Sequence, residues 1–419
     1  MNRTFCPANI LLPDFSRTDG TKWSVVACDQ YTSDRAYWQT VESFVGNAPS
    51  TLRLMLPEVF LAESKTRVPV IHDAMRRAIA ETLVSHPNAM IALERTQADG
   101  RVRRGIVGAV DLESYDYNKG STSPIRATEG TVLERIPPRV AVRRGAPLEL
   151  PHVMLLVDDP DRTVIEPLFP RAAAPVYDFD LMQNGGHVRG TLLSADEQNS
   201  VTDALAALVT PEAMKAKYGS SALAPLLFAV GDGNHSLASA KAYYEELKTA
   251  LGDAALSHPA RYALAEVVNI HDSALVFEPI YRVAFGADPA DLLAAFRAYV
   301  SRLNGSADAQ SITVLWNGQT ETVAVPHPEK QLAVGTLQTF LDAYLASHPS
   351  VTVDYIHGED AVRSLVAAEP SNVGFLFEGM QKSDLFRTVL YDGALPRKTF
   401  SMGHAHDKRF YLECRKIGE

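Results

Sequence analysis

The residues best suited to chemistry lie in a short turn, residues 231–236, with the sequence Gly-Asp-Gly-Asn-His-Ser. The apolar run 226–230 before it predicts a strand buried on both faces. Apolar positions at helical spacing predict a helix from residue 236 to about 251. Glycines in such a turn permit positive φ and the close approach of a ligand. With Asn234 or Ser236 as the helix cap, the unpaired N–H groups and the helix dipole suit an anion such as phosphate.

The side chains of this turn have candidate roles in catalysis and in binding. Asp232 is a candidate metal ligand, and His235 is a candidate donor to a phosphate oxygen. Five further residues are candidates for cofactor binding: Gly231, Gly233, Asn234, Ser236 and Lys241. The pattern is neither the Walker motif nor the dinucleotide fingerprint. A plain strand-to-helix turn explains the glycines and the cap, but it explains the aspartate and the histidine together poorly.

A second candidate segment covers residues 124–131 and continues to Glu134 and Arg135. Carboxylate, hydroxyl and guanidinium groups packed this closely can supply a general base and an anion clamp. A solvated loop with surface ion pairs fits the same spacing. The segment therefore leaves both interpretations open.

A third candidate segment, residues 397–409, is dense in basic, hydroxyl and imidazole groups, which suits phosphate binding. Its candidate phosphate-binding residues are Lys398, Lys408 and Arg409. His404 and His406 are candidate metal ligands, although alternate positions on a strand would place them on one face with or without a metal. The pair His271-Asp272 is expected to cap or to hydrogen-bond locally.

Strand and helix patterns intermix along the whole chain. Predicted helices cover residues 68–85, the segment from the capping box of Ser194 and Glu197 towards 209, and the segment after Asp288-Pro289. Predicted strands include 153–157 and two hairpins, which join 90–94 to 104–110 and 311–316 to 319–325. We therefore expect a mixed α/β or α+β fold, with mixed sheets and packed helices. We expect three parts, 1–150, 151–285 and 286–419, of which the second carries the turn and the third contributes the basic segment.

Composition and charge narrow the class of protein. The length of 419 residues predicts two or three domains, and 46% hydrophobic with 21% charged residues is an ordinary globular composition. The net charge of −10 argues against a general nucleic-acid binder, because that role needs a basic field. No apolar run is long enough for a membrane span, and residues 1–15 lack the pattern of a secretory signal, so a cytoplasmic location is expected. Three widely separated cysteines exclude a disulfide framework and a four-cysteine zinc site.

Several separated blocks, in one order, make the sequence similar to the prokaryotic family called domain of unknown function 1015. The resemblance covers most of the chain. The blocks are Cys28-Asp29-Gln30-Tyr31, Gly105-Ile106-Val107-Gly108, Thr128-Glu129-Gly130-Thr131, residues 231–236, Glu278-Pro279-Ile280-Tyr281-Arg282 and Arg397-Lys398-Thr399-Phe400. The commoner form of the central motif is Asp-Gly-His-His-Arg, so Asn234 stands here at the first histidine and Ser236 at the arginine.

The central motif is also similar, more distantly, to that of ParB/sulfiredoxin-like nucleotide-binding proteins, which include a free-serine kinase. By analogy, the fold would include a core of that kind, and the motif would approach nucleotide phosphates. The resemblance implies that Asp232 and His235 act on phosphate and Mg²⁺, and that Glu129 is the base towards a hydroxyl acceptor. The implied cofactors are ATP or ADP and Mg²⁺.

The leading hypothesis from the sequence is an enzyme, a nucleotide-dependent kinase of a small hydroxylated metabolite, with serine as the first acceptor to try. One alternative is a nucleotide-binding regulatory protein without turnover. Another is a metal-dependent phosphohydrolase that uses the same anion site. The expected partners are a nucleotide and a small metabolite, without nucleic acid or membrane, and a homodimer is compatible with the sequence.

Overall fold

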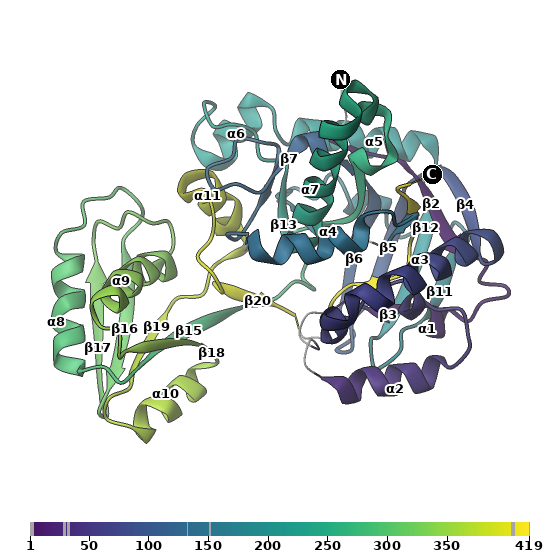
Figure 1. Ribbon diagram of the computed structural model, residues 1–419. Coiled ribbons are helices and arrows are strands. Elements are labelled where there is room, and N and C mark those ends of the chain that lie inside the picture. Colours follow the sequence, from purple (N-terminus) through teal and green to yellow (C-terminus); the bar gives the residue numbers. More distant parts are fainter. Residues whose placement is uncertain are drawn as a thin grey trace. The chain divides into compact units, whose positions relative to one another are not determined.

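The chain folds into two compact units (Figure 1). The computed structural model describes residues 4–27, 31, 34–131, 133–150, 152–403 and 407–418. Unit 1 comprises residues 1–127, 131–275 and 403–419, and unit 2 comprises residues 128–130 and 276–402. The sequence led us to expect three parts with other boundaries, and that division into domains stays a prediction.

Unit 1 is built around a large mixed sheet. Its strands follow the order β11-β12-β5-β6-β14-β10-β13-β8-β7, and β1 pairs with β6. The bounds are β1 Phe5–Cys6, β5 Ile91–Thr96, β6 Val102–Asp111, β7 Tyr115–Asp116, β8 Ile125–Ala127, β10 Met154–Val157, β11 Tyr177–Asp180, β12 His187–Leu192, β13 Phe228–Asp232 and β14 Tyr262–Asn269. Three two-stranded sheets complete the unit: β2 Ala8–Pro13 with β4 Leu83–Ala89, β3 Val25–Val26 with β21 Phe410–Tyr411, and β9 Leu148–Glu149 with β22 Arg415–Lys416.

Four central strands of this sheet form two parallel pairs that run in opposite directions. β13 is parallel to β8, and β10 is parallel to β14, whereas β10 and β13 are antiparallel to each other. The carboxyl end of β13 therefore lies at the same sheet edge as the amino end of β10, and Met154 pairs with Asp232 there. The carboxyl ends of β10 and β14 lie at the opposite edge.

Two hydrophobic cores cover the two faces of the main sheet. The alternation of side chains along β6 separates them, because Val107 and Ala109 belong to one core whereas Ile106 and Val110 belong to the other. The helices of unit 1 are α1 Gly20–Trp23, α2 Arg35–Val45, α3 Ser64–Glu81, α4 Ile136–Arg143, α5 Ala195–Ala207, α6 Pro211–Tyr218 and α7 Asn234–Leu251. Helix α7 buries Leu237, Ala240 and Tyr244 of the predicted apolar stripe against the core that contains Phe228, whereas Leu251 at its end is exposed.

Unit 2 is a second mixed α/β body with its own sheet, in the order β17-β16-β19-β15-β18, and β20 extends it by pairing with β15. The strands are β15 Phe277–Phe285, β16 Gln310–Trp316, β17 Gln319–Val325, β18 Thr352–His357, β19 Val373–Phe377 and β20 Phe400–Met402. The helices are α8 Pro289–Val300, α9 Ala333–Ser347, α10 Glu359–Ala368 and α11 Lys382–Asp392. Aromatic rings pack the helices against the sheet, since Phe296 of α8 contacts the rings of Phe340 on α9 and Phe375 on β19.

The expected mixed α/β class is confirmed, and so are most of the elements with strong local signals. Both predicted hairpins form, as β5–β6 and β16–β17. The capping box of Ser194 and the cap at Asp288 are also present. The helix predicted over 68–85 is wrong at its carboxyl end, because α3 stops at Glu81 and β4 pairs with β2 instead. No helix in the described part of the chain is long and apolar enough to cross a membrane.

Candidate functional site

The turn at 231–236 connects β13 to α7 as predicted, and its glycines are required by the local geometry. Gly233 has a φ of +82°, which L side chains rarely adopt. At Gly231, a Cβ atom would lie 2.8 Å from Leu156 Cγ on the neighbouring strand. The prediction that Asn234 or Ser236 caps the helix is wrong, because α7 begins at Asn234 and Gly233 is its N-cap. Since glycine has no side chain, no side-chain hydrogen bond caps this helix.

Asp232 is the last residue of β13, and its carboxylate contacts Lys408, which is distant in the sequence. Oδ1 accepts a hydrogen bond of 2.9 Å from the Gly233 N–H. Oδ2 lies 3.5 Å from Nζ of Lys408. The side chains of Asp232 and Lys408 are 26% and 15% exposed, so solvent still reaches the pair. The structure thus brings together two of the residues predicted from separate segments.

His235 and Ser236 occupy the first turn of α7, and both are half-buried. The main-chain oxygen of His235 accepts a hydrogen bond of 2.6 Å from Ser239 Oγ. Ser236 Oγ lies 3.1 Å from Nε2 of His152, a residue that the sequence did not single out. The ring of His152 also meets Tyr411 edge to face, with centroids 5.4 Å apart.

His152 is the functional candidate that sequence reasoning missed, and the reason lies in the topology. It lies two positions before β10, and only the antiparallel pairing of β10 with β13 brings the start of one strand to the end of the other. Its Cδ2 would be 3.5 Å from a Cβ on Gly233, so the ring packs directly against the turn. A polar residue just before a predicted strand was the available signal, and it is a weak one.

Two of the predicted basic residues are engaged elsewhere in unit 1. Lys241 Nζ donates to the main-chain oxygen of Leu112 at 2.9 Å and pairs with Glu245 at 2.7 Å. Arg409 is 4% exposed and forms ion pairs with Glu266 at 2.7 Å and Glu413 at 2.5 Å. Burial lowers the pKa of Arg409, but the charges of Glu413 and Glu266 outweigh this and hold it above the usual value. We therefore leave both residues out of the proposed site.

The network around Arg409 borders a small cavity of its own. Its lining residues are Leu93, Arg95, Arg103, Leu181, Val188, Glu266, Arg409, Phe410, Leu412 and Glu413. Glu266 is fully buried and accepts hydrogen bonds from both Arg103 and Arg409. Burial raises the pKa of Glu266, but the charges of these two arginines outweigh it and hold the pKa below the usual value. The lining includes no residue of the turn, so we assign this cavity to the packing of the sheet rather than to the candidate site.

Glu129 and Lys398 belong to unit 2, whereas Asp232, His235 and Lys408 belong to unit 1. Glu129 is half-buried and forms an isolated parallel bridge with Leu395. Lys398 is exposed and has a positive φ of 51°. The roles of Glu129 as a base and of Lys398 in cofactor binding stay predictions.

A buried arginine holds the backbone that carries Lys398. Arg282, which is fully buried, donates to the main-chain oxygens of Arg397 at 2.9 Å and Lys398 at 3.1 Å. Burial lowers the pKa of Arg282 to about 10. The motif 278–282 thus meets the block 397–400 within unit 2, and its arginine has a structural role there.

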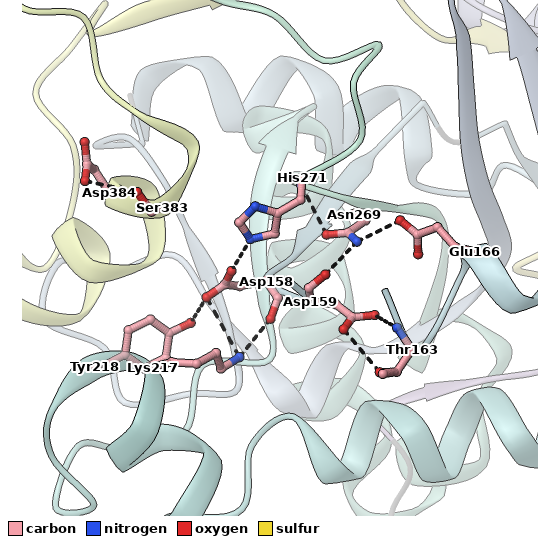
Figure 2. A network of polar contacts seen from close by, with 10 residues as sticks. All are labelled: Asp158, Asp159, Thr163, Glu166, Lys217, Tyr218, Asn269, His271, Ser383 and Asp384. Atoms are coloured by element: carbon pink, nitrogen blue, oxygen red, sulfur yellow. Dashed lines mark hydrogen bonds and ion pairs between the residues drawn. The ribbon is translucent and has the colours of Figure 1, made fainter. Parts of the chain in front are cut away.

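A second polar cluster lies at the opposite edge of the main sheet, beyond the carboxyl ends of β10 and β14 (Figure 2). Asp158 accepts hydrogen bonds from Tyr218 at 2.5 Å and from His271 Nε2 at 2.7 Å, and Lys217 Nζ lies 3.8 Å away. Burial raises the pKa of Asp158, but these partners outweigh it and hold the pKa below its usual value. The expectation that His271 bonds only locally is wrong, since its partner Asp158 is distant in sequence.

The donor set near Asp232 limits how a metal could be held. The described residues contain no group of three or more His, Cys, Asp or Glu side chains that could hold a metal ion. Mg²⁺ commonly uses one or two carboxylates together with the phosphates of its substrate. Asp232 therefore fits an ion that arrives with a nucleotide. The residues Cys28, Asp29 and Gln30, and the metal candidates His404 and His406, lie outside the described residues.

A comparison with the models of known protein families identifies the family of this chain. The model of the family described as "Protein of unknown function (DUF1015)" matches residues 14–344. The chain belongs to this family. None of the curated proteins matches the chain. The family assignment confirms the resemblance drawn from the separated sequence blocks.

Solved structures with a similar arrangement were also found, at low identity. A variant of a free serine kinase in complex with AMP is 9% identical, with a TM-score of 0.39, and the match covers 76% of this chain and 93% of that one. A conserved hypothetical protein from Pyrococcus furiosus is 9% identical, with a TM-score of 0.33 and coverage of 70% and 89%. SbnI from Staphylococcus aureus, truncated at its C-terminus, is 10% identical, with a TM-score of 0.32 and coverage of 71% and 82%. At these scores the likeness carries no argument about function.

Proposed function

We propose that this protein is a small-molecule phosphotransferase, a nucleotide-dependent kinase of a hydroxylated metabolite, with serine as the first acceptor to test. The observation that carries the proposal is the start of α7. Helix α7 begins at Asn234 after a glycine N-cap, without a side-chain cap, beside the Asp232–Lys408 pair. The first turn of a helix offers N–H groups and the positive end of the dipole, which favour a phosphate group.

Each residue of the proposed site has a distinct task. The first-turn amides and Lys408 would bind nucleotide phosphates, because both supply positive charge where the transferred group is negative. Asp232 would contact a Mg²⁺ ion that the nucleotide carries, and the ion would neutralise phosphate charge. His235 would donate to a phosphate oxygen. Glu129 belongs to unit 2, and its role as the base towards the acceptor hydroxyl is a proposal carried over from the resemblance alone.

A transfer assay with labelled nucleotide tests this function. The full chain is incubated with labelled ATP or ADP and Mg²⁺, with and without serine and a panel of other hydroxylated metabolites. Label on an acceptor supports the kinase. Free phosphate instead indicates a phosphohydrolase, and thermal stabilisation by nucleotide without any product indicates a binding protein. Either of the last two results would overturn the proposal.

Two lysine variants provide a matched comparison within the same assay. We expect Lys408→Met to weaken nucleotide binding about tenfold, which corresponds to ~1.4 kcal/mol. Lys241→Met should leave it unchanged, because Lys241 is bonded to Leu112 and Glu245. Isothermal titration with ATP or ADP measures both. Equal losses in the two variants would mean that general charge, rather than the turn, governs binding.

A further inference from the structure

A serine and a histidine form a close pair at the start of α7, in the geometry of a nucleophile with its base. Ser236 Oγ lies 3.1 Å from His152 Nε2, which is within hydrogen-bonding reach. Ser236 is in the first turn of the helix, and His152 lies two positions before β10. The pair therefore joins two elements that meet only through the antiparallel pairing of β10 with β13.

The position of the imidazole is set by packing on two sides. One side meets Tyr411 edge to face, with an interplanar angle of 86°. On another side, its Cδ2 would lie 3.5 Å from a Cβ on Gly233, which is the distance of an ordinary van der Waals contact, so the ring lies close to the turn. Burial raises the pKa of Tyr411, which keeps its phenol protonated and neutral beside the ring. With its proton on Nδ1, the neutral imidazole presents Nε2 as the acceptor for the serine hydroxyl.

The location of Ser236 suits a negatively charged product. A phosphate ester on this oxygen would lie in the first helical turn, where the dipole and the amide groups favour negative charge. Ser239, on the same helix, provides the contrast, since its hydroxyl donates to the main-chain oxygen of His235 at 2.6 Å.

We propose that Ser236 is a covalent phosphoryl acceptor and that His152 is the base that takes its proton. The inference rests on the proposed function, because the donor is the bound nucleotide. The bond from Ser236 Oγ to the terminal phosphorus forms as the bond from that phosphorus to the bridging oxygen breaks. The hydroxyl proton passes to His152 Nε2, and the nucleotide leaves one phosphate shorter, with the electron pair on its bridging oxygen. A second transfer to a metabolite would regenerate the serine.

The phosphoenzyme can be detected directly. The full chain is incubated with labelled ATP or ADP and Mg²⁺ in the absence of acceptor, and the labelled peptide is identified by mass spectrometry. We expect one phosphoryl group on Ser236, stable in acid as a serine ester, unlike a phosphohistidine at His152 or His235. Ser236→Ala should abolish the label, whereas Ser239→Ala should retain it.

The role of the base is tested by a conservative variant. His152→Gln keeps a hydrogen-bonding side chain, so we expect the fold to persist and the labelling rate to fall about 100-fold. In the unmodified chain, the rate should rise with pH over the range where imidazole loses its proton, and this rise should disappear in the variant. Circular dichroism and thermal unfolding verify that each variant is folded. A purely structural histidine would not change the pH profile.

The outcomes separate this inference from the function on which it rests. Acceptor phosphorylation without label on Ser236 would overturn the inference and leave the kinase standing, as a direct transfer. Label on Ser236 that is unaffected by His152→Gln would overturn the role of the base. Neither label nor acceptor product, with nucleotide binding retained, would overturn both proposals and leave a binding protein.

Discussion

Asp158 follows β10 and Asp232 is the last residue of β13, so both lie at the carboxyl ends of central strands, but at opposite edges of the sheet and in different environments. Asp158 is buried and is held by Tyr218, His271 and Lys217 (Figure 2). Asp232 is 26% exposed, and Nζ of Lys408 lies 3.5 Å from its Oδ2 atom. A buried carboxylate whose oxygens already accept hydrogen bonds stabilises the fold. A half-exposed carboxylate can still bind a ligand through its oxygens.

The largest expected effect is the loss of stability when the buried carboxylate is neutralised. We expect Asp158→Asn to lower the free energy of unfolding by about 3 kcal/mol, because Tyr218, His271 and Lys217 would lose the buried carboxylate that they contact. Asp232→Asn should cost less than about 1 kcal/mol, since its ion pair is partly solvated. Denaturant titration of both variants measures the two changes. Similar losses at the two positions would break the comparison.

The pH dependence of stability sharpens the same contrast. The folded-state pKa of Asp158 is depressed, so its contribution is present above the unfolded pKa and is lost as pH falls through the folded value. The unmodified chain should therefore lose stability in acid more steeply than Asp158→Asn. Unfolding free energies measured from neutral pH into the acid range provide the test.

An intermediate effect is expected for the backbone of the turn. Gly233→Ala would place a Cβ 3.1 Å from Val153 Cα at a φ of +82°. We expect a loss of about 1–2 kcal/mol in the free energy of unfolding, because alanine tolerates this conformation poorly. Nucleotide affinity should also fall, because strain at Gly233 would displace the first-turn amides that are proposed to bind phosphate. Gly219→Ala is the control, because Gly219 also has a positive φ but no atom within 4 Å of its Cβ position.

The smallest effect concerns an exposed histidine–aspartate cluster. His187 on β12 lies 2.7 Å from both Asp178 and Asp180 on β11, and its side chain is 38% exposed. Burial lowers the pKa of His187, but hydrogen bonds with Asp180 and Asp178 outweigh this and raise it above the usual value. The stabilisation is present below the unfolded pKa and is lost as pH rises through the folded value.

Because solvent screens this cluster, we expect His187→Gln to change stability by less than about 0.5 kcal/mol at acid pH and by nothing measurable at alkaline pH. Unfolding titrations at two pH values check the sign. A loss as large as that of Asp158→Asn would mean that burial does not govern the difference between these His–Asp contacts.

Local sequence signals predicted the elements that depend on few neighbours. The hairpin turns and the capping box of Ser194 need only adjacent residues, and each is present. The strand predicted over 226–230 is present as β13, which begins and ends two residues later. The end of α3 was mispredicted because β4 pairs with β2. The two strands are distant in the sequence, so the local pattern of apolar residues does not predict their pairing. The cap of α7 was mispredicted because Gly233, in a left-handed conformation, is the N-cap of the helix. Asn234 and Ser236, which were expected to cap the helix, already lie within it.

The sequence by itself determined the mixed α/β class, the family and the turn at 231–236, because these depend on local patterns and residue identity. Only the tertiary structure decided which residues share an edge. It joined Lys408 to Asp232 and His152 to Ser236, committed Lys241 and Arg409 to other contacts, and buried Asp158. The physical reason is that the direction and register of paired strands bring side chains together that are distant in the sequence. Neither property can be predicted from one segment of the chain alone.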